Sequence, residues 1–286
     1  MTAQEIIQAI RSAAPLPQLP LPRGLEGKAP KEFPTCDVIH YGDPGKEVHK
    51  IATTFMATVD VIREAARQQV DMIITHEPTF HTGLPSWDWL EGSPVYEQKK
   101  HLLNESGILV WRFHDGMHMS PGLRTDLIYA GWNQEFGWEA YHGPQVGMGK
   151  HEYRLPATTV GELVALFKRR LHIPTIRVIG RADTPVETLG LLVGGGSLGL
   201  GDENMPSKLM LESGLDLLIC GEIIEWTSCS YVRDAAQLGL NKAMIVLGHN
   251  RTEEPGMKHL PAWLKTVLPA GLEYTFIEAG DPFDYL

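Results

Sequence analysis

The chain has little of several features that define other protein classes. Its 286 residues include three cysteines, Cys36, Cys220 and Cys229, and no C-x-x-C pair, so neither a disulfide framework nor a thiolate zinc site is indicated. No apolar run approaches the roughly 20 residues that cross a bilayer, and the N-terminus lacks the basic and then apolar layout of a signal peptide. We therefore expect a cytoplasmic protein that does not span a membrane, with nitrogen and oxygen ligands for any metal.

Positive charge is also scarce, because the chain has 25 Lys and Arg residues against 35 Asp and Glu residues, which gives a net charge of −10. Proteins that bind duplex nucleic acid neutralise phosphates with clustered Lys and Arg in excess. The charge balance therefore excludes duplex nucleic acid as a partner, although a single local cation could still bind one phosphate group. We expect a small-molecule substrate, with phosphate- and nucleotide-containing compounds among the candidates.

The length suits two domains or two halves that share a core. Residues 1–34 predict a surface helix and then a connector, since the stretch 15–34 contains six prolines and suits neither a helix nor a central strand. After the connector, apolar strands alternate with amphipathic helices, which indicates crossover connections and a mostly parallel α/β sheet. We place a first α/β repeat at 35–135 and a second at 136–286.

The second half repeats the first. The segment VDMIITHE at 70–77 matches LDLLICGE at 215–222, so that Asp71 corresponds to Asp216 and Glu77 to Glu222. Further along, the residues that follow the next strand also correspond in the two halves. The chain is therefore predicted to be an internal duplication of one α/β unit.

Metal-binding side chains follow three of the predicted strands. They are His76 and Glu77 at the first, His114, Asp115 and His118 at the second, and His249 and Glu253 at the third. The carboxyl ends of parallel strands share one edge of a sheet, where ligands gather. Imidazole and carboxylate together suit zinc, iron, manganese or nickel. A single histidine at a strand end is usually structural, but three such groups together predict a metal site.

A glycine-rich turn offers a different interpretation. GGGSLG at 194–199 fits G-x-G-x-x-G after a strand, as in dinucleotide-binding loops. The acidic residue expected about 20 positions on is missing from a strand end, however, since Asp216 begins its strand. Ser197 as a nucleophile lacks the G-x-S-x-G context.

Three motifs resemble the dinuclear metal centre hexameric proteins, a family named after an NGG-interacting factor and also labelled type 2 GTP cyclohydrolase. The family patterns D-x-I-I-x-H-H-P, H-T-N-L-D-x-x-x-G-G-x-N-D and G-H-x-x-x-E read DMIITHEP, HDGMHMSPGLRTD and GHNRTE here. The resemblance covers residues 47–286. It implies two intertwined α/β repeats with mixed, mostly parallel sheets, assembled as a homo-hexamer.

The resemblance also implies a set of metal ligands. Carried over position by position, they are His76, Glu77, His118, His249 and Glu253. Glu77 stands for a second histidine, and His118 stands for an aspartate that is expected to bridge two ions. Because a neutral imidazole does not easily bridge, the bridge falls to Glu253 or Glu77, or Asp115 reaches in instead. The number of divalent ions per chain, one or two, remains open.

The leading hypothesis is a metal-dependent hydrolase in which these ions activate water. Glu222 or Asp115 is the candidate that orients the water or carries its proton, and His114 is a candidate partner of a ligand. The alternative from another functional class is a non-enzymatic metal-binding scaffold that stores metal or has a regulatory role. A third hypothesis is a nucleotide-binding module built on GGGSLG.

Overall fold

The fold is taken from a computed structural model, which describes residues 1–17, 35–83, 87–143 and 150–285. Most of the predicted connector at 15–34 lies outside these ranges. The chain divides into two compact units, with 1–131 and 256–279 in unit 1 and 132–255 and 280–286 in unit 2. The chain thus enters each unit twice, which is the intertwined order expected. The repeat boundaries 1–34, 35–135 and 136–286 stay predictions.

Unit 1 contains a five-stranded sheet in the order β1-β4-β3-β2-β10. Its strands are β1 (Ile39–Tyr41), β2 (Lys50–Met56), β3 (Met72–Glu77), β4 (Leu109–Arg112) and β10 (Glu273–Phe276). All neighbours are parallel except β1 and β4. The central strands are buried apolar runs, as expected for a parallel sheet covered on both faces.

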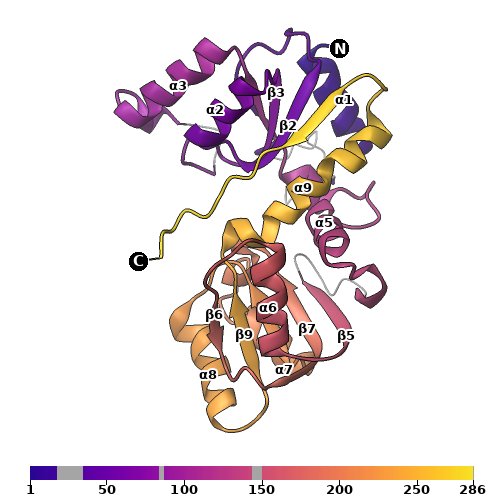
Figure 1. Cartoon of the computed structure of the whole chain (residues 1–286), viewed down its shortest axis with the longest axis vertical. Coiled ribbons are helices and arrows are strands. Elements are labelled where there is room, and N and C mark those ends of the chain that lie inside the picture. The colour runs from indigo at the N-terminus through magenta and orange to yellow at the C-terminus, as the bar shows by residue number, and fades with distance from the viewer. Residues whose placement is uncertain (18–34, 84–86, 144–149, 286) are drawn as a thin grey trace, which may run out of the picture. The chain divides into compact units, whose positions relative to one another are not determined.

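Helices cover the two faces of this sheet (Figure 1). The helices with residues in unit 1 are α1 (Ala3–Ala13), α2 (Val59–Arg67), α3 (Pro94–Ser106), α4 (Asp115–Met119), α5 (Leu127–Phe136) and α9 (His249–Val267), with a 3-10 turn at Asp88–Leu90. α2 and α3 build one apolar cluster with β2, β3 and β4. α9 reaches the sheet where Thr53 Oγ1 donates to the Met257 carbonyl at 2.8 Å. Local signals set the helix ends, since Thr2 and Glu5 form a capping box at α1 and Gly107, at φ 63°, ends α3.

Unit 2 contains the second sheet, in the order β5-β7-β8-β9-β6. Its strands are β5 (His151–Thr159), β6 (Arg177–Ile179), β7 (Pro185–Leu192), β8 (Leu217–Cys220) and β9 (Ala243–Val246). Besides parts of α5 and α9, it contains the helices α6 (Val160–Arg170), α7 (Met205–Glu212) and α8 (Ser230–Gln237). Strands β7, β8 and β9 are parallel, and both edge strands run antiparallel to their neighbours. Shorter turns lie at Glu139–Tyr141, Gly194–Leu198 and Glu225–Cys229. None of the helices in the described ranges combines the length and apolar character needed to cross a membrane.

The two sheets share one plan. The order β1-β4-β3-β2 in unit 1 matches β6-β9-β8-β7 in unit 2, with the antiparallel strand at the same edge. Asp71 Oδ2 accepts two consecutive backbone N–H groups beside the start of β2 at 2.8 and 3.1 Å. Asp216 Oδ2 accepts two in β7 at 3.0 and 2.9 Å. The predicted fold class, two duplicated α/β units with mixed, mostly parallel sheets, is therefore confirmed.

Candidate metal centre

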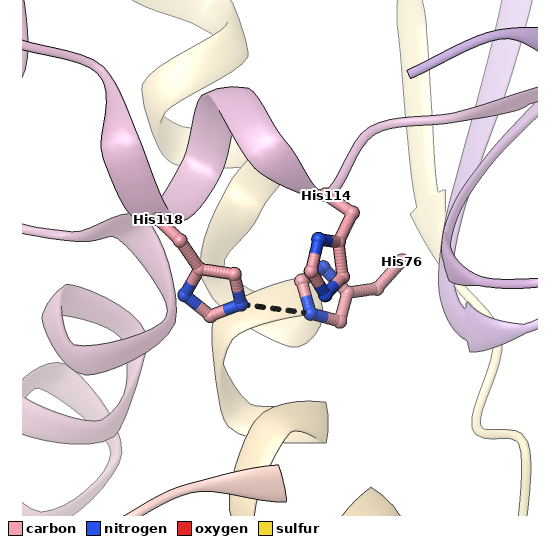
Figure 2. Close-up of side chains that lie close together, drawn as sticks. All are labelled: His76, His114 and His118. Atoms are coloured by element: carbon pink, nitrogen blue, oxygen red, sulfur yellow. Dashed lines mark hydrogen bonds between the residues drawn. The ribbon is translucent and has the colours of Figure 1, made fainter. Parts of the chain in front are cut away.

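Three histidines of unit 1 lie together at the carboxyl end of the first sheet. His76 lies near the end of β3, His114 directly precedes α4, and His118 lies in α4 (Figure 2). One ring nitrogen of each lies within 4.8 Å of those of the other two. The Nε2 atoms of His76 and His118 are 3.2 Å apart. Two of the predicted ligands thus meet, and His114, expected only beside a ligand, joins them.

Each of these rings is held through its Nδ1 atom by an oxygen. The partners are Asp126 Oδ2 for His118 at 2.7 Å, the Phe113 carbonyl for His76 at 3.3 Å, and Asp115 Oδ1 for His114 at 3.0 Å. Because these oxygens accept, we assign the proton of each neutral ring to Nδ1 and the lone pair to Nε2. Oxygen acceptors on the far nitrogen are the usual support of metal-binding histidines.

The donor set fits a divalent cation. With zinc–nitrogen bonds of about 2.0–2.1 Å, two ligands of a tetrahedral site lie about 3.3 Å apart, close to the 3.2 Å between the Nε2 atoms of His76 and His118. In the assigned tautomers the two Nε2 lone pairs face each other and repel, and a shared cation would remove the repulsion. The spacing of these two rings is therefore compatible with a pair of metal ligands.

Electrostatics keeps His114 neutral and Asp115 ionised. Burial and nearby His76 together lower the pKa of the His114 ring to about 4, against the opposing effect of the hydrogen bond to Asp115. Burial acts to raise the pKa of the Asp115 carboxyl, but hydrogen bonds from His114, Cys36 and Thr35 outweigh it and lower the pKa. A neutral imidazole is the form that binds metal. His114 is therefore ready to act as a ligand at neutral pH.

Arg112 holds Glu77 in a buried ion pair. The guanidinium donates to Glu77 Oε2 at 2.7 Å, to the His76 carbonyl at 2.9 Å and to the Gly83 carbonyl at 3.0 Å. The other carboxylate oxygen, Oε1, lies 3.8 Å from His114 Nε2. Glu77 Oε1 thus lies on the side of the histidines, where it could serve as a metal ligand.

Asp37 fixes the start of α4. Its Oδ1 accepts from the backbone N–H of His114 at 2.7 Å and of Asp115 at 2.8 Å, and its Oδ2 accepts from Gly116 at 2.9 Å. These bonds satisfy N–H groups that have no partner within the helix. Asp37 therefore sets the backbone that carries His114 and His118, and no motif in the sequence pointed to it.

Unit 2 has its own pair of candidate ligands. His249 opens α9, and its Nε2 lies 3.0 Å from Glu253 Oε2, one helical turn further on. The Nδ1 atom of His249 lies 2.8 Å from Glu222 Oε1. The four-residue spacing thus gives the expected pair. Glu222 and Asp115, the two predicted catalytic carboxylates, each contact Nδ1 of a histidine, and their action on water stays a prediction.

The glycine turn of unit 2 packs against this pair. Gly194, at φ +52°, is so close that a Cβ atom there would lie 2.0 Å from Glu253 Oε1 and 2.7 Å from His249 Nε2. Residues Gly194–Leu198 form a 3-10 turn, and α7 begins only at Met205. The turn does not open a helix directly, as a dinucleotide loop must, and Ser197 Oγ donates to the Gly194 carbonyl at 3.1 Å. The turn makes room for the ligand pair.

Gly194→Ala should therefore lower zinc affinity at least about tenfold, the lower end of effects seen when the support of a ligand is lost. The added methyl group displaces Glu253 and His249. Competition with a chromogenic chelator measures the affinity. The matched control is Gly201→Ala, since Gly201 has φ +97° and nothing within 4 Å of an added Cβ, so it shares the backbone strain without the clash. Equal affinity in both variants would contradict the assignment.

The candidate ligands are divided between the two units. His76, Glu77 and His118 belong to unit 1, and His249 and Glu253 belong to unit 2. Within each unit the candidates lie together. The expectation that both sets meet around one cation stays a prediction.

The chain has relatives of similar length. A Clostridium perfringens protein named GTP cyclohydrolase 1 type 2 homolog is 25% identical over 251 residues, which cover 86% of this chain and 89% of the relative. A Salmonella typhimurium protein of the same name is 26% identical over 246 residues, which cover 83% and 87%.

The chain also resembles solved structures and matches a family model. A hypothetical protein of Staphylococcus aureus superposes with a TM-score of 0.70 at 16% identity, covering 100% of this chain and 99% of that one. A Bacillus cereus protein related to NIF3 gives 0.69 at 14% identity with the same coverage. At this identity the likeness shows the fold alone. Residues 37–282 match the family model described as Duf34/NIF3 (NGG1p interacting factor 3). The chain therefore belongs to the Duf34/NIF3 family.

Proposed function

We propose that this chain binds divalent metal ions and acts as a metal-dependent hydrolase. One observation carries the proposal: His76, His114 and His118 each have an oxygen at Nδ1, and one ring nitrogen of each lies within 4.8 Å of the other two. Three imidazoles and nearby carboxylates suit zinc, iron, manganese or nickel, with one or two ions per chain. Calcium and magnesium prefer more oxygen ligands.

The chain's own residues have distinct parts in this proposal. The three histidines hold the ion in unit 1, Glu77 adds one oxygen, and His249 with Glu253 supplies the ligands of unit 2. A divalent ion in such a site supplies Lewis-acid chemistry, including acidification of water. Asp115 and Glu222 keep two of the rings in the tautomer that leaves Nε2 unprotonated. As carboxylates beside the ligands, they are also the candidate proton acceptors.

The proposed substrate class is based on the name of the relatives and on the net charge of the chain. The relatives carry the name GTP cyclohydrolase 1 type 2 homolog, which supports hydrolysis of a small phosphate-containing ring compound. The net charge of −10 favours such a substrate over duplex nucleic acid. A cytoplasmic location and assembly into six copies stay predictions.

A second candidate is a non-enzymatic scaffold that stores metal or regulates. The number of protein donors favours it, because ions enclosed wholly by protein ligands leave no position for a substrate. Turnover separates the two candidates. Metal-free protein and protein with one and two equivalents of zinc are compared on a phosphomonoester and a phosphodiester probe, and hydrolysis that requires zinc supports the enzyme.

Metal content tests the proposal itself. Elemental analysis of the purified full chain should find one or two divalent ions per chain, and His249→Ala should lose most of the bound metal if both ligand sets serve one centre. If the sets serve separate centres, the variant keeps the metal of unit 1 and loses only that of unit 2. Absence of tightly bound metal in the wild-type protein, even after zinc is added and excess removed, contradicts the proposal.

A further inference from the structure

A cavity of about 630 Å³ lies in unit 2 between the edge strand β6 and helix α8. Ile179, Ile223 and Val246 form part of its lining, and polar and charged side chains form most of the rest. Small-molecule sites in proteins have volumes of about 300–1,000 Å³ and are mostly apolar, with a few polar groups that fix the ligand. The cavity has the size of such a site.

Two arginines line this cavity and form no ion pair within the described residues. Arg177 comes from β6 and Arg233 from α8, and both are exposed. Across the ranges that the structure describes, neither guanidinium makes a hydrogen bond or an ion pair. By contrast, the exposed Arg181 is paired with Asp183 at 2.6 Å. Guanidinium groups bind phosphate and carboxylate through paired N–H bonds, so two unpaired ones beside a cavity favour an anionic ligand.

Trp226 offers a flat surface at the same place. It lines the cavity from the π-helical turn Glu225–Cys229, and 77% of its surface is exposed. Such π-helical turns are frequent at functional sites, and an exposed indole stacks well on planar rings. Glu225 and Asp234 also line the cavity and supply acceptors for N–H or O–H groups of a ligand.

Some residues that line the cavity are close in sequence to the ligand pair of unit 2. Ile223 follows Glu222, which contacts Nδ1 of His249 at 2.8 Å, and Val246 ends β9, three residues before His249. Both belong to the carboxyl ends of parallel strands, where α/β proteins bind ligands. A molecule held by Arg177 and Trp226 therefore lies on the same edge of the sheet as the His249 and Glu253 pair.

We propose that this cavity binds a planar aromatic anion as the substrate of a metal ion at the His249 and Glu253 pair of unit 2. The ring stacks on Trp226, and its phosphate or carboxylate group is bound by Arg177 and Arg233. That the bound anion is a substrate rests on the proposed function, whereas its binding is inferred from the cavity alone.

Binding is tested on the full chain with metal removed by EDTA, so that the result does not depend on the metal centre. Isothermal titration calorimetry uses phenyl phosphate, benzoate, a nucleoside 5′-monophosphate and inorganic phosphate as probes. We expect the double variant Arg177→Ala/Arg233→Ala to weaken the ring-bearing probes at least about tenfold, which is the loss of about 1.4 kcal/mol. Trp226→Ala should weaken the same probes about fivefold or more and leave inorganic phosphate unchanged.

The controls are Arg181→Ala, which removes a paired arginine, and Trp89→Ala, which removes another exposed tryptophan in unit 1. Both should bind as the wild type does. Tighter binding of the phosphate probes identifies a phosphate ester, and tighter binding of benzoate identifies a carboxylate; either result supports the inference. It is overturned if no ring-bearing probe binds more tightly than about 10 mM, or if the cavity variants bind like the controls. Metal content of the same proteins, measured before EDTA treatment, reports separately on the proposed function.

Discussion

His118→Ala should lower the affinity of the protein for zinc at least about 100-fold. The Nε2 atom of His118 lies 3.2 Å from that of His76, and its Nδ1 is held by Asp126 at 2.7 Å. Loss of a partner behind a ligand typically costs 10–100-fold in metal affinity, so loss of the ligand itself should reach or exceed the upper end. His118 is the best ligand to test because it is only half-buried, and its removal leaves a small cavity.

Chelator competition measures this affinity, and circular dichroism verifies that the variant is folded. His101→Ala is the matched control, because His101 is an exposed histidine on α3 whose Nε2 pairs with Glu105 at 3.2 Å. Asp126→Asn provides an intermediate case, since the amide still occupies the space but no longer fixes the ring through a charge. An affinity in His118→Ala equal to that of His101→Ala would refute the three-histidine site.

Arg112→Met should lower the free energy of unfolding by about 3–5 kcal/mol, the usual cost of removing one partner from a buried ion pair. The side chains of Arg112 and Glu77 are only 5% and 11% exposed. The substitution leaves the Glu77 carboxylate buried without its cation, and it also removes a donor from the His76 carbonyl. The loss should therefore come mainly from an uncompensated charge.

Urea unfolding in EDTA measures the effect, because bound metal would add its own stabilisation to the folded state. Arg181→Met is the matched control, since the Arg181–Asp183 pair is 78% and 68% exposed, and exposed pairs contribute about 0–1 kcal/mol. The double variant Arg112→Met/Glu77→Gln should recover at least half of the loss. A single variant within 1 kcal/mol of the wild type, or a double variant without recovery, speaks against a buried charge pair.

Much of the fold could be predicted because its signals are local. The apolar runs of β2, β3 and β4 and of β7, β8 and β9 recur in the same order, and Thr159 with Glu162 forms the capping box that starts α6. Two edge strands escaped prediction. β5 alternates buried His151, Tyr153 and Leu155 with polar residues, a period-two pattern that its charged side chains obscure.

β10 has no comparable local signal. Its four residues, from Glu273 to Phe276, are partly exposed, and they form a strand because they pair in parallel with β2. That pairing joins parts of the chain that are far apart in sequence, which no local pattern reveals.

The candidate site was predictable where a ligand lies at the end of a strand or a few residues after it. His76 and His118 were expected and lie together, whereas His114 was expected only as a partner of a ligand. Arg112 was overlooked, although a single charge in the apolar run ILVWRF is a signal of a buried ion pair. Asp37 gave no signal, because its role depends on the backbone N–H groups of α4.

The late position of β10 has a consequence for how the protein is made. β2 gains its outer neighbour only when synthesis has reached residue 276, after nearly all of unit 2 has been produced. Until then one side of β2 is a bare edge with unpaired N–H and C=O groups, which is the kind of surface that attracts other chains. The nascent first sheet therefore needs shielding for most of translation, and premature termination anywhere before β10 yields an aggregation-prone fragment rather than a smaller working protein.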